Sequence, residues 1–183
     1  MDGIDGTLLH TNGKTFQRSN INVSLEYQKE TKVLLNEIEK YAKDFIDKKK
    51  DFQYIANLVT EDHSNVVKEI FKQTDCKVDL IGFHGQTIYH SFKEKLSIQI
   101  GSPKYLSKKT GVKVVSSFRQ NDIKNGGQGA PLAPIYHMAI MRDLNLDLPA
   151  CFVNIGGVAN LTYFDAKNLI GFDTGPGNGL MDR

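Results

Sequence analysis

Two glycine-rich segments near the carboxyl end of the chain constrain its fold most. Residues 151–155 are apolar and typical of a buried strand, and the Gly156-Gly157 pair allows a sharp turn into a second strand over residues 159–164. Further on, residues 171–178 read Gly-Phe-Asp-Thr-Gly-Pro-Gly-Asn. The sequence therefore predicts strands joined by tight turns over residues 151–172.

The octamer at residues 171–178 combines one carboxylate with an unusually bare backbone. Its apolar start is expected to deliver Asp173 into a loop made rigid by Pro176 and left without side chains at Gly175 and Gly177. Such a loop lets backbone N–H groups approach an anion, and a carboxylate beside it suits general-base chemistry next to a phosphate. An ordinary Gly/Pro turn carrying an Asp fits the same residues.

Two other glycine segments leave similar alternatives open. The turn at residues 154–160 can place its amides and Asn side chains under a phosphate, or it can be a plain hairpin. Residues 125–132 are rich in glycine and precede a predicted helix, and a helix amino end binds anions readily. Their spacing matches neither the dinucleotide fingerprint nor the Walker A loop.

Taken together, six co-linear segments resemble the anhydro-N-acetylmuramic acid kinases, sugar kinases of the actin-like, Hsp70-like superfamily. The segments are Met1-Asp-Gly-Ile-Asp5, residues 83–90, Phe118-Arg119 with Asp122, and residues 126–131, 154–160 and 171–178. They follow the family's order and extend from the first residue almost to the last. Six motifs in order are far more specific than any one of them.

The alternation of strands and helices indicates an α/β fold with a mixed sheet. The resemblance implies a ribonuclease H-like (actin-like ATPase) fold, with the first lobe nearly complete and the second lobe truncated. On that map residues 1–125 form the first lobe without its first strand. Residues 126–183 form a connecting helix and the start of the second lobe.

The family activity implies a chemistry and a set of residues. Phosphate from ATP goes to the 6-oxygen of 1,6-anhydro-N-acetylmuramic acid while water opens the anhydro ring, which yields N-acetylmuramic acid 6-phosphate for peptidoglycan recycling and amino-sugar catabolism. ATP is the implied cofactor and Mg²⁺ is expected with it, although no residue is assigned as its ligand. By match to the family base, Asp173 would activate the attacking water.

The resemblance also implies two groups of binding residues. Those expected to hold the ATP phosphates are Asp2, Gly3, Asp5, Asn154, Gly156, Gly157, Asn160, Gly175, Gly177 and Asn178. Those expected to bind the sugar are His84, Gln86, Arg119 and Asp122. An ion pair between Arg119 and Asp122 is an equal alternative for these two side chains.

The chain also departs from the family pattern. In the family, a strand and the residues Gly-Thr-Ser come before Met-Asp-Gly, whereas this chain begins at Met1. Ser117 stands where the family usually has an Asp before Phe-Arg. The chain also stops at Arg183, soon after Asp173, before the rest of the expected second lobe. We therefore expect a start or a frame lesion upstream of Met1, and a sheet that exposes unpaired backbone or borrows a strand. The alternatives to a kinase are half of a split kinase, a non-catalytic remnant, or a nucleotide-binding regulator on the same fold.

The overall composition excludes several partner classes. The net charge is +2, and the lysines at residues 48–50 suit a solvated helix end, so no nucleic-acid partner is expected. No apolar run is long enough for a membrane, and Cys76 and Cys151 lack metal or redox spacing, which indicates a cytoplasmic protein. The expected partner is a small amino-sugar substrate, with a homodimer or a complementing C-terminal half left open.

Helix signals are clearest in the first half of the chain. Ser24 is predicted to cap a helix that ends near Lys48, with Leu34, Ile38, Tyr41 and Phe45 on its apolar face. A second helix is predicted to carry Ile55, Val59, Val66 and Ile70 on one side. Helices are also predicted over residues 103–110, stopped by Gly111, and 130–143. Strands are predicted over residues 6–10, 78–83, 97–100 and 112–115.

Overall fold

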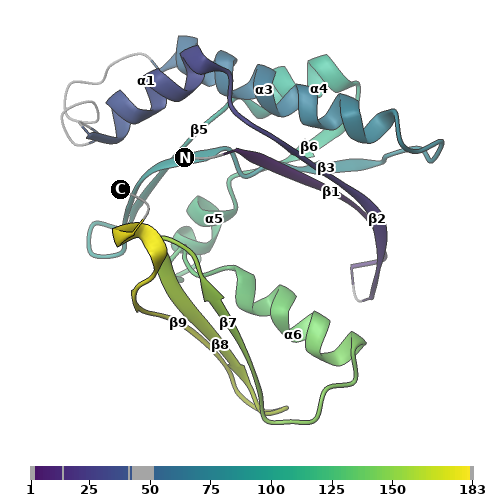
Figure 1. Cartoon of the computed structure of the whole chain (residues 1–183), viewed down its shortest axis with the longest axis vertical. Helices are drawn as coiled ribbons and strands as arrows, with labels where there is room; N and C mark the ends of the chain where they lie inside the picture. The colour runs from purple at the N-terminus through teal and green to yellow at the C-terminus, as the bar shows by residue number, and fades with distance from the viewer. Residues whose placement is uncertain (1–2, 14, 41, 43–51, 182–183) are drawn as a thin grey trace. The chain divides into compact units, whose positions relative to one another are not determined.

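The chain folds into two compact units, Met1–Gly126 and Gly127–Arg183, which are described separately (Figure 1). The computed structural model describes residues 3–13, 15–40, 42 and 52–181. Within these ranges no helix combines the length and the apolar character needed to cross a membrane. The predicted helix end near Lys48 and two residues of the predicted apolar face, Tyr41 and Phe45, lie outside the described part of the chain.

The first unit alternates strands and helices, which confirms the α/β class. Its elements are β1 (Ile4–Thr11), β2 (Phe16–Leu25), α1 (Lys29–Lys40), α3 (Gln53–Phe71), β3 (Leu80–Gly82), β4 (Gln86–Ser91), β5 (Leu96–Ile100), α4 (Pro103–Thr110), β6 (Lys113–Val115) and α5 (Phe118–Lys124). Strands β1 and β2 pair antiparallel, as do β4 and β5, whereas β3 and β6 pair parallel. Helix α4 lies between β5 and β6 in sequence, as a crossover to a parallel strand requires.

The predicted start of the first helix is wrong, because Ser24 lies inside β2 and α1 begins only at Lys29. Ile21, Val23 and Leu25 alternate with polar residues, which is the period of a strand, and Ser24 pairs with Asp5 of β1. A favourable cap residue was therefore outweighed by strand pairing. Strand β3 ends at Gly82, one residue before the predicted end at residue 83, and β4 begins soon after it at Gln86.

The core of the first unit is built on α3, as the sequence predicts. Its four predicted apolar positions are all buried: Ile55, Val59, Val66 and Ile70. At Gly6 of β1 the helix comes so close that an added Cβ would lie 2.6 Å from Val66 Cγ1 and 2.9 Å from Ile70 Cδ1. The missing side chain at this glycine is what allows the strand to lie directly on the helix.

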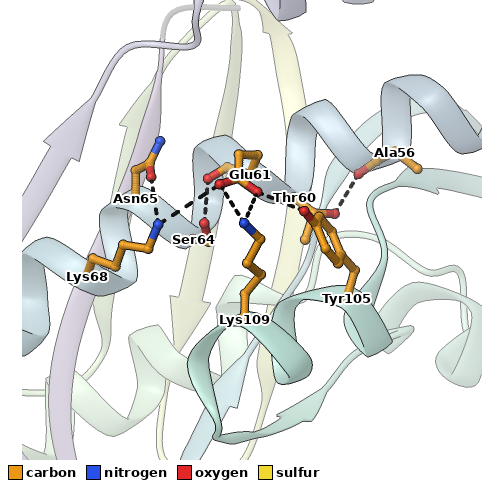
Figure 2. Close-up of polar contacts among 8 residues, drawn as sticks. All are labelled: Ala56, Thr60, Glu61, Ser64, Asn65, Lys68, Tyr105 and Lys109. Atoms are coloured by element: carbon orange, nitrogen blue, oxygen red, sulfur yellow. Dashed lines mark hydrogen bonds and ion pairs between the residues drawn. The ribbon is translucent and has the colours of Figure 1, made fainter.

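Helix α4 docks on α3 through a cluster of polar contacts (Figure 2). The carboxylate of Glu61 accepts hydrogen bonds from Lys109 Nζ at 3.0 Å and from the Tyr105 hydroxyl at 3.0 Å. The buried Thr60 hydroxyl donates to Ala56 O at 2.5 Å and accepts from the Ser102 N–H at 2.8 Å. These contacts fix the start of α4, and the left-handed Gly111 ends that helix as predicted.

The second unit consists of one helix on a three-stranded antiparallel sheet in the order β7-β8-β9. Its elements are α6 (Ala133–Asp143), β7 (Ala150–Ile155), β8 (Val158–Phe164), β9 (Leu169–Pro176) and the short 3-10 helix η1 (Asn178–Leu180). The predicted strand–Gly-Gly–strand hairpin is confirmed. On α6, His137 stacks on Phe152 with ring centroids 5.0 Å apart and lies 2.8 Å from Thr162 Oγ1.

Candidate functional site

A row of three polar side chains crosses the second-unit sheet at its glycine-rich end. Asn154 of β7 pairs with Asn160 of β8, and Asn160 pairs with Asp173 of β9. Directly opposed residues of an antiparallel sheet point to the same face. The pairing therefore brings together three of the predicted site residues, and it places them on the face that carries Thr162 and α6.

Asp173 lies in a strand rather than in the predicted loop, because β9 continues to Pro176. The register steps from Asn160 opposite Asp173 to Ala159 opposite Gly175, so Thr174 is the extra residue of a β-bulge. The Thr174 hydroxyl donates to Ala159 O at 3.1 Å, and Gly175 has a φ of +148°. The predicted Gly/Pro segment thus shapes the end of a strand, and no sequence signal indicated the bulge.

The carboxylate of Asp173 is exposed and chemically available. Across the described ranges of the chain, no side chain forms a hydrogen bond or ion pair with it. Two residues earlier, Gly171 packs against the amino end of α6, where an added Cβ would lie 2.4 Å from Pro134 Cγ and 3.3 Å from Pro131 Cγ. The row therefore shares its face with a helix amino end, which carries partial positive charge.

The glycines of this unit divide into two kinds. A Cβ at Gly157 would meet nothing within 4 Å, and one at Gly156 would meet no atom closer than 3.7 Å, so the hairpin turn is open to a ligand. A Cβ at Gly177 would lie 2.0 Å from Gly156 O. Gly177 also donates its N–H to Gly157 O at 3.1 Å, and Asn178 donates its N–H to Gly156 O at 2.9 Å. These two backbone hydrogen bonds hold the hairpin turn against the chain that follows β9.

In the first unit, the predicted phosphate residues stand at the start of β1. Asp5 is exposed and pairs with Ser24. A Cβ at Gly3 would lie 2.8 Å from Leu25 O, so close backbone packing accounts for this glycine. Asp2, predicted with them, lies outside the described residues.

His84 and Arg119, 35 residues apart in sequence, are brought into direct contact. Arg119 Nε donates to His84 Nε2 at 2.8 Å, and His84 Nδ1 lies 3.0 Å from Gly85 O. A guanidinium only donates, so Nε2 must be the acceptor and the ring proton is assigned to Nδ1. Burial lowers the pKa of His84, and the Arg119 charge lowers it further. The imidazole is therefore held neutral in one tautomer.

The remaining predicted sugar-binding residues have different surroundings. Gln86 Oε1 accepts from the Tyr27 hydroxyl at 3.0 Å, and burial raises the pKa of Tyr27 to about 12. Asp122 lies with Arg119 on α5. Sequence reasoning missed Gln99, which lines a small cavity of about 70 Å³ beside His84 and has a buried Oε1 without a hydrogen-bond partner among the described residues.

The chemistry of the described residues can be compared with what a nucleotide phosphate and Mg²⁺ require. No three His, Cys, Asp or Glu side chains gather there as a metal cage. Mg²⁺ in phosphate-transferring sites is commonly held by one or two carboxylates together with substrate phosphates, and an exposed carboxylate such as that of Asp5 suits such an arrangement. The turn at Gly156 and Gly157 suits a phosphate, because a Cβ at either glycine would meet no atom closer than 3.7 Å.

Comparison with known proteins gives one consistent family. The family described as anhydro-N-acetylmuramic acid kinase matches residues 1–183. A protein of that name from Pelagibacter ubique is 42% identical over 189 residues, and one from Rhizobium etli is 40% identical over 191 residues. Both alignments cover 100% of this chain but 50% and 52% of the relatives, so the chain spans about half their length. The chain belongs to the anhydro-N-acetylmuramic acid kinase family.

Proposed function

We propose that this chain provides the phosphate-binding hairpin and the general base of an ATP-dependent kinase. The kinase converts 1,6-anhydro-N-acetylmuramic acid to N-acetylmuramic acid 6-phosphate. The observation that carries the proposal is the row Asn154, Asn160 and Asp173, in which no described side chain bonds the carboxylate, near an open Gly-Gly turn. Family membership and the names of the relatives support the substrate class.

In this proposal Asp173 accepts a proton from the water that attacks the anomeric carbon. The bond from that carbon to the bridging 6-oxygen breaks, and the 6-oxygen takes the phosphoryl group that ATP supplies. A carboxylate without another partner is free to accept the proton, and general-base catalysis contributes about 10²–10⁴-fold in rate. The side chains of Asn154 and Asn160 and the backbone at Gly156 and Gly157 orient the phosphates.

The first unit is assigned the complementary roles. Gly3 and Asp5, together with Asp2, contact phosphate or its Mg²⁺, and His84, Gln86, Arg119 and Asp122 bind the sugar. Arg119 Nε and Gly85 O engage the two ring nitrogens of His84, so these contacts hold the imidazole in one fixed orientation at the proposed sugar site. Family membership supports a ribonuclease H-like arrangement of two lobes and a cytoplasmic setting.

A second candidate is a chain that is inactive alone, either as half of a split kinase or as a non-catalytic remnant. The two candidates predict different outcomes when the chain is joined to the rest of a relative.

The test is a chimera in which this chain is joined to the unmatched half of the Pelagibacter ubique relative. Labelled ATP and 1,6-anhydro-N-acetylmuramic acid are supplied, and calorimetry follows nucleotide binding. Asp173→Asn should lower turnover by about 10²–10⁴-fold and leave nucleotide binding intact, because the amide cannot accept the proton. Gly156→Val should weaken nucleotide binding itself. Near-normal turnover in Asp173→Asn would show that the base is wrongly assigned, and an inactive parent chimera would favour the remnant.

A further inference from the structure

One amide side chain in the first unit has a buried carbonyl oxygen that no described group satisfies. Gln99 lies on β5, opposite Thr87 of β4. Its Nε2 donates to Ser97 Oγ at 2.7 Å and to Thr87 Oγ1 at 3.3 Å. Its Oε1 is buried and has no hydrogen-bond partner among the described residues. Buried polar groups of native proteins are nearly always hydrogen-bonded, so this oxygen indicates a place for a donor that the described residues do not supply.

The cavity at Gln99, of about 70 Å³, is lined by both buried and exposed residues. Phe83 is buried, whereas His84, Ser117 and Gln120 are exposed. A water molecule needs a site of roughly 10–15 Å³, so the cavity has room for a hydroxyl group and the atom that carries it. A ligand group can therefore enter from the exposed side and bring its hydroxyl to the Gln99 amide.

Two glycines bring the walls of this cavity together. Gly85 and Gly101 have φ values of +71° and +141°. A Cβ at Gly85 would lie 2.6 Å from Ile100 O, and one at Gly101 would lie 2.5 Å from Phe83 Cζ. Both positions therefore require a residue without a side chain. The cavity belongs to the backbone at the ends of the β4–β5 hairpin, so its shape is set before any ligand binds.

His84, which is expected to bind the sugar, has both ring nitrogens engaged. Its Nε2 accepts from Arg119 Nε at 2.8 Å, and its Nδ1 lies 3.0 Å from Gly85 O. The ring can pack against a sugar, but neither nitrogen is left to hydrogen-bond it while these contacts hold. The Arg119 charge also disfavours a cationic ligand beside it. These observations favour a neutral donor, with Gln99 Oε1 as its acceptor.

We propose that Gln99 Oε1 accepts a hydrogen bond from one neutral hydroxyl group, which water supplies in the free protein and the sugar supplies in the complex. The identity of the sugar rests on the proposed function. In 1,6-anhydro-N-acetylmuramic acid the anhydro bridge uses the oxygen between carbons 1 and 6, the acetamido group occupies carbon 2, and the lactyl ether occupies carbon 3. The hydroxyl on carbon 4 is the one that remains. Gln99 is therefore the residue that determines specificity for a sugar with a free 4-hydroxyl.

The first arm of the test uses this chain alone and needs no sugar. Nuclear Overhauser effects from water are measured on the backbone N–H groups of Gly101 and Ser117, which line the cavity. We expect signals of the sign given by bound water in the parent and in Gln99→Glu, which keeps an acceptor of the same shape. Gln99→Met, of similar length but without the amide, should lose them. The serine hydroxyls are unchanged in all three chains, so they serve as the internal control.

Two outcomes of this arm would overturn the proposal. If the parent chain gave no such signals, the carbonyl oxygen would hold no hydroxyl. If the signals persisted in Gln99→Met, the water would be held by other groups of the cavity. Neither outcome depends on kinase activity, so this arm is independent of the test of the proposed function.

The second arm measures sugar binding by calorimetry in the chimera described above, without ATP. The 4-deoxy analogue should bind about tenfold or more weakly than the parent sugar, because it leaves the buried acceptor unpaired. The same ratio should hold in Gln99→Glu, whereas in Gln99→Met the two sugars should bind within about threefold of each other. An equal ratio in all three proteins would contradict the role of Gln99, and a Gln99→Glu that behaved like Gln99→Met would mean that the amide presents its NH₂ group. A chimera that bound neither sugar would contradict the proposed substrate, and the water measurement would still decide whether Gln99 holds a hydroxyl.

Discussion

Gly177 and Gly157 both resemble phosphate-loop glycines in sequence, but the structure predicts different losses of stability when each is replaced by alanine. We predict that Gly177→Ala destabilises the glycine-rich end of the second unit, whereas Gly157→Ala does not. The new Cβ at Gly177 would lie 2.0 Å from Gly156 O and 3.2 Å from Ala159 N, both backbone atoms that cannot rotate away. At Gly157 the same methyl group would meet nothing within 4 Å.

The magnitude follows from the contacts that Gly177→Ala must break. Separating the chain at Gly177 from the hairpin removes the bonds Gly177 N–H to Gly157 O and Asn178 N–H to Gly156 O. Each backbone hydrogen bond contributes about 0.5–1.5 kcal/mol net, so the free energy of local opening should fall by about 1–3 kcal/mol. A surface change such as Gly157→Ala should stay within about 0.5 kcal/mol.

Amide hydrogen exchange at Asn178 measures this opening directly. A fall of 1–3 kcal/mol corresponds to exchange that is about 5- to 150-fold faster in Gly177→Ala. In the chimera, Gly157→Ala should weaken nucleotide binding without changing exchange, since its methyl group occupies the open side of the turn. If Gly177→Ala exchanged within twofold of Gly157→Ala, the packing role of Gly177 would be refuted.

Two further predictions concern the first unit. Thr60→Val should lower the free energy of unfolding by about 1–3 kcal/mol, because the Ser102 N–H loses its acceptor. A urea titration measures this loss, and Thr60→Ser should retain most of the stability. Equal losses in the two variants would contradict the prediction. Burial lowers the pKa of His63, so folding favours the neutral ring and the stability of the fold should fall as the pH drops below the unfolded pKa of about 6.5. The urea midpoints at pH 7 and pH 5 should therefore differ less in His63→Gln than in the unsubstituted chain. An unchanged difference would remove His63 as the cause.

Elements governed by local signals could be predicted from the sequence. Helix α3 was predicted from the spacing of its apolar residues, and α4 from Pro103 and Gly111, which act within a single turn of helix. The hairpin at Gly156 and Gly157 depends on turn geometry that is equally local.

Features set by contacts distant in sequence could not be predicted in the same way. The boundary between β2 and α1 depends on pairing of β2 with β1, which the cap signal at Ser24 does not report. The bulge at Thr174 is a property of register, and the contact of Arg119 with His84 joins residues 35 positions apart. Sequence similarity marked these last two residues without indicating that one holds the tautomer of the other.

Strand pairing sets the spacing of the three side chains in the row formed by Asn154, Asn160 and Asp173. Neighbouring strands lie about 4.8 Å apart, so the backbone at Asn160 lies about one strand spacing from Asp173 and the backbone at Asn154 about two. This spacing is inherited from the backbone ladder and not from the conformation of any loop. Substitutions in the turn between β8 and β9 that keep the strand register should therefore leave the distances within the row unchanged.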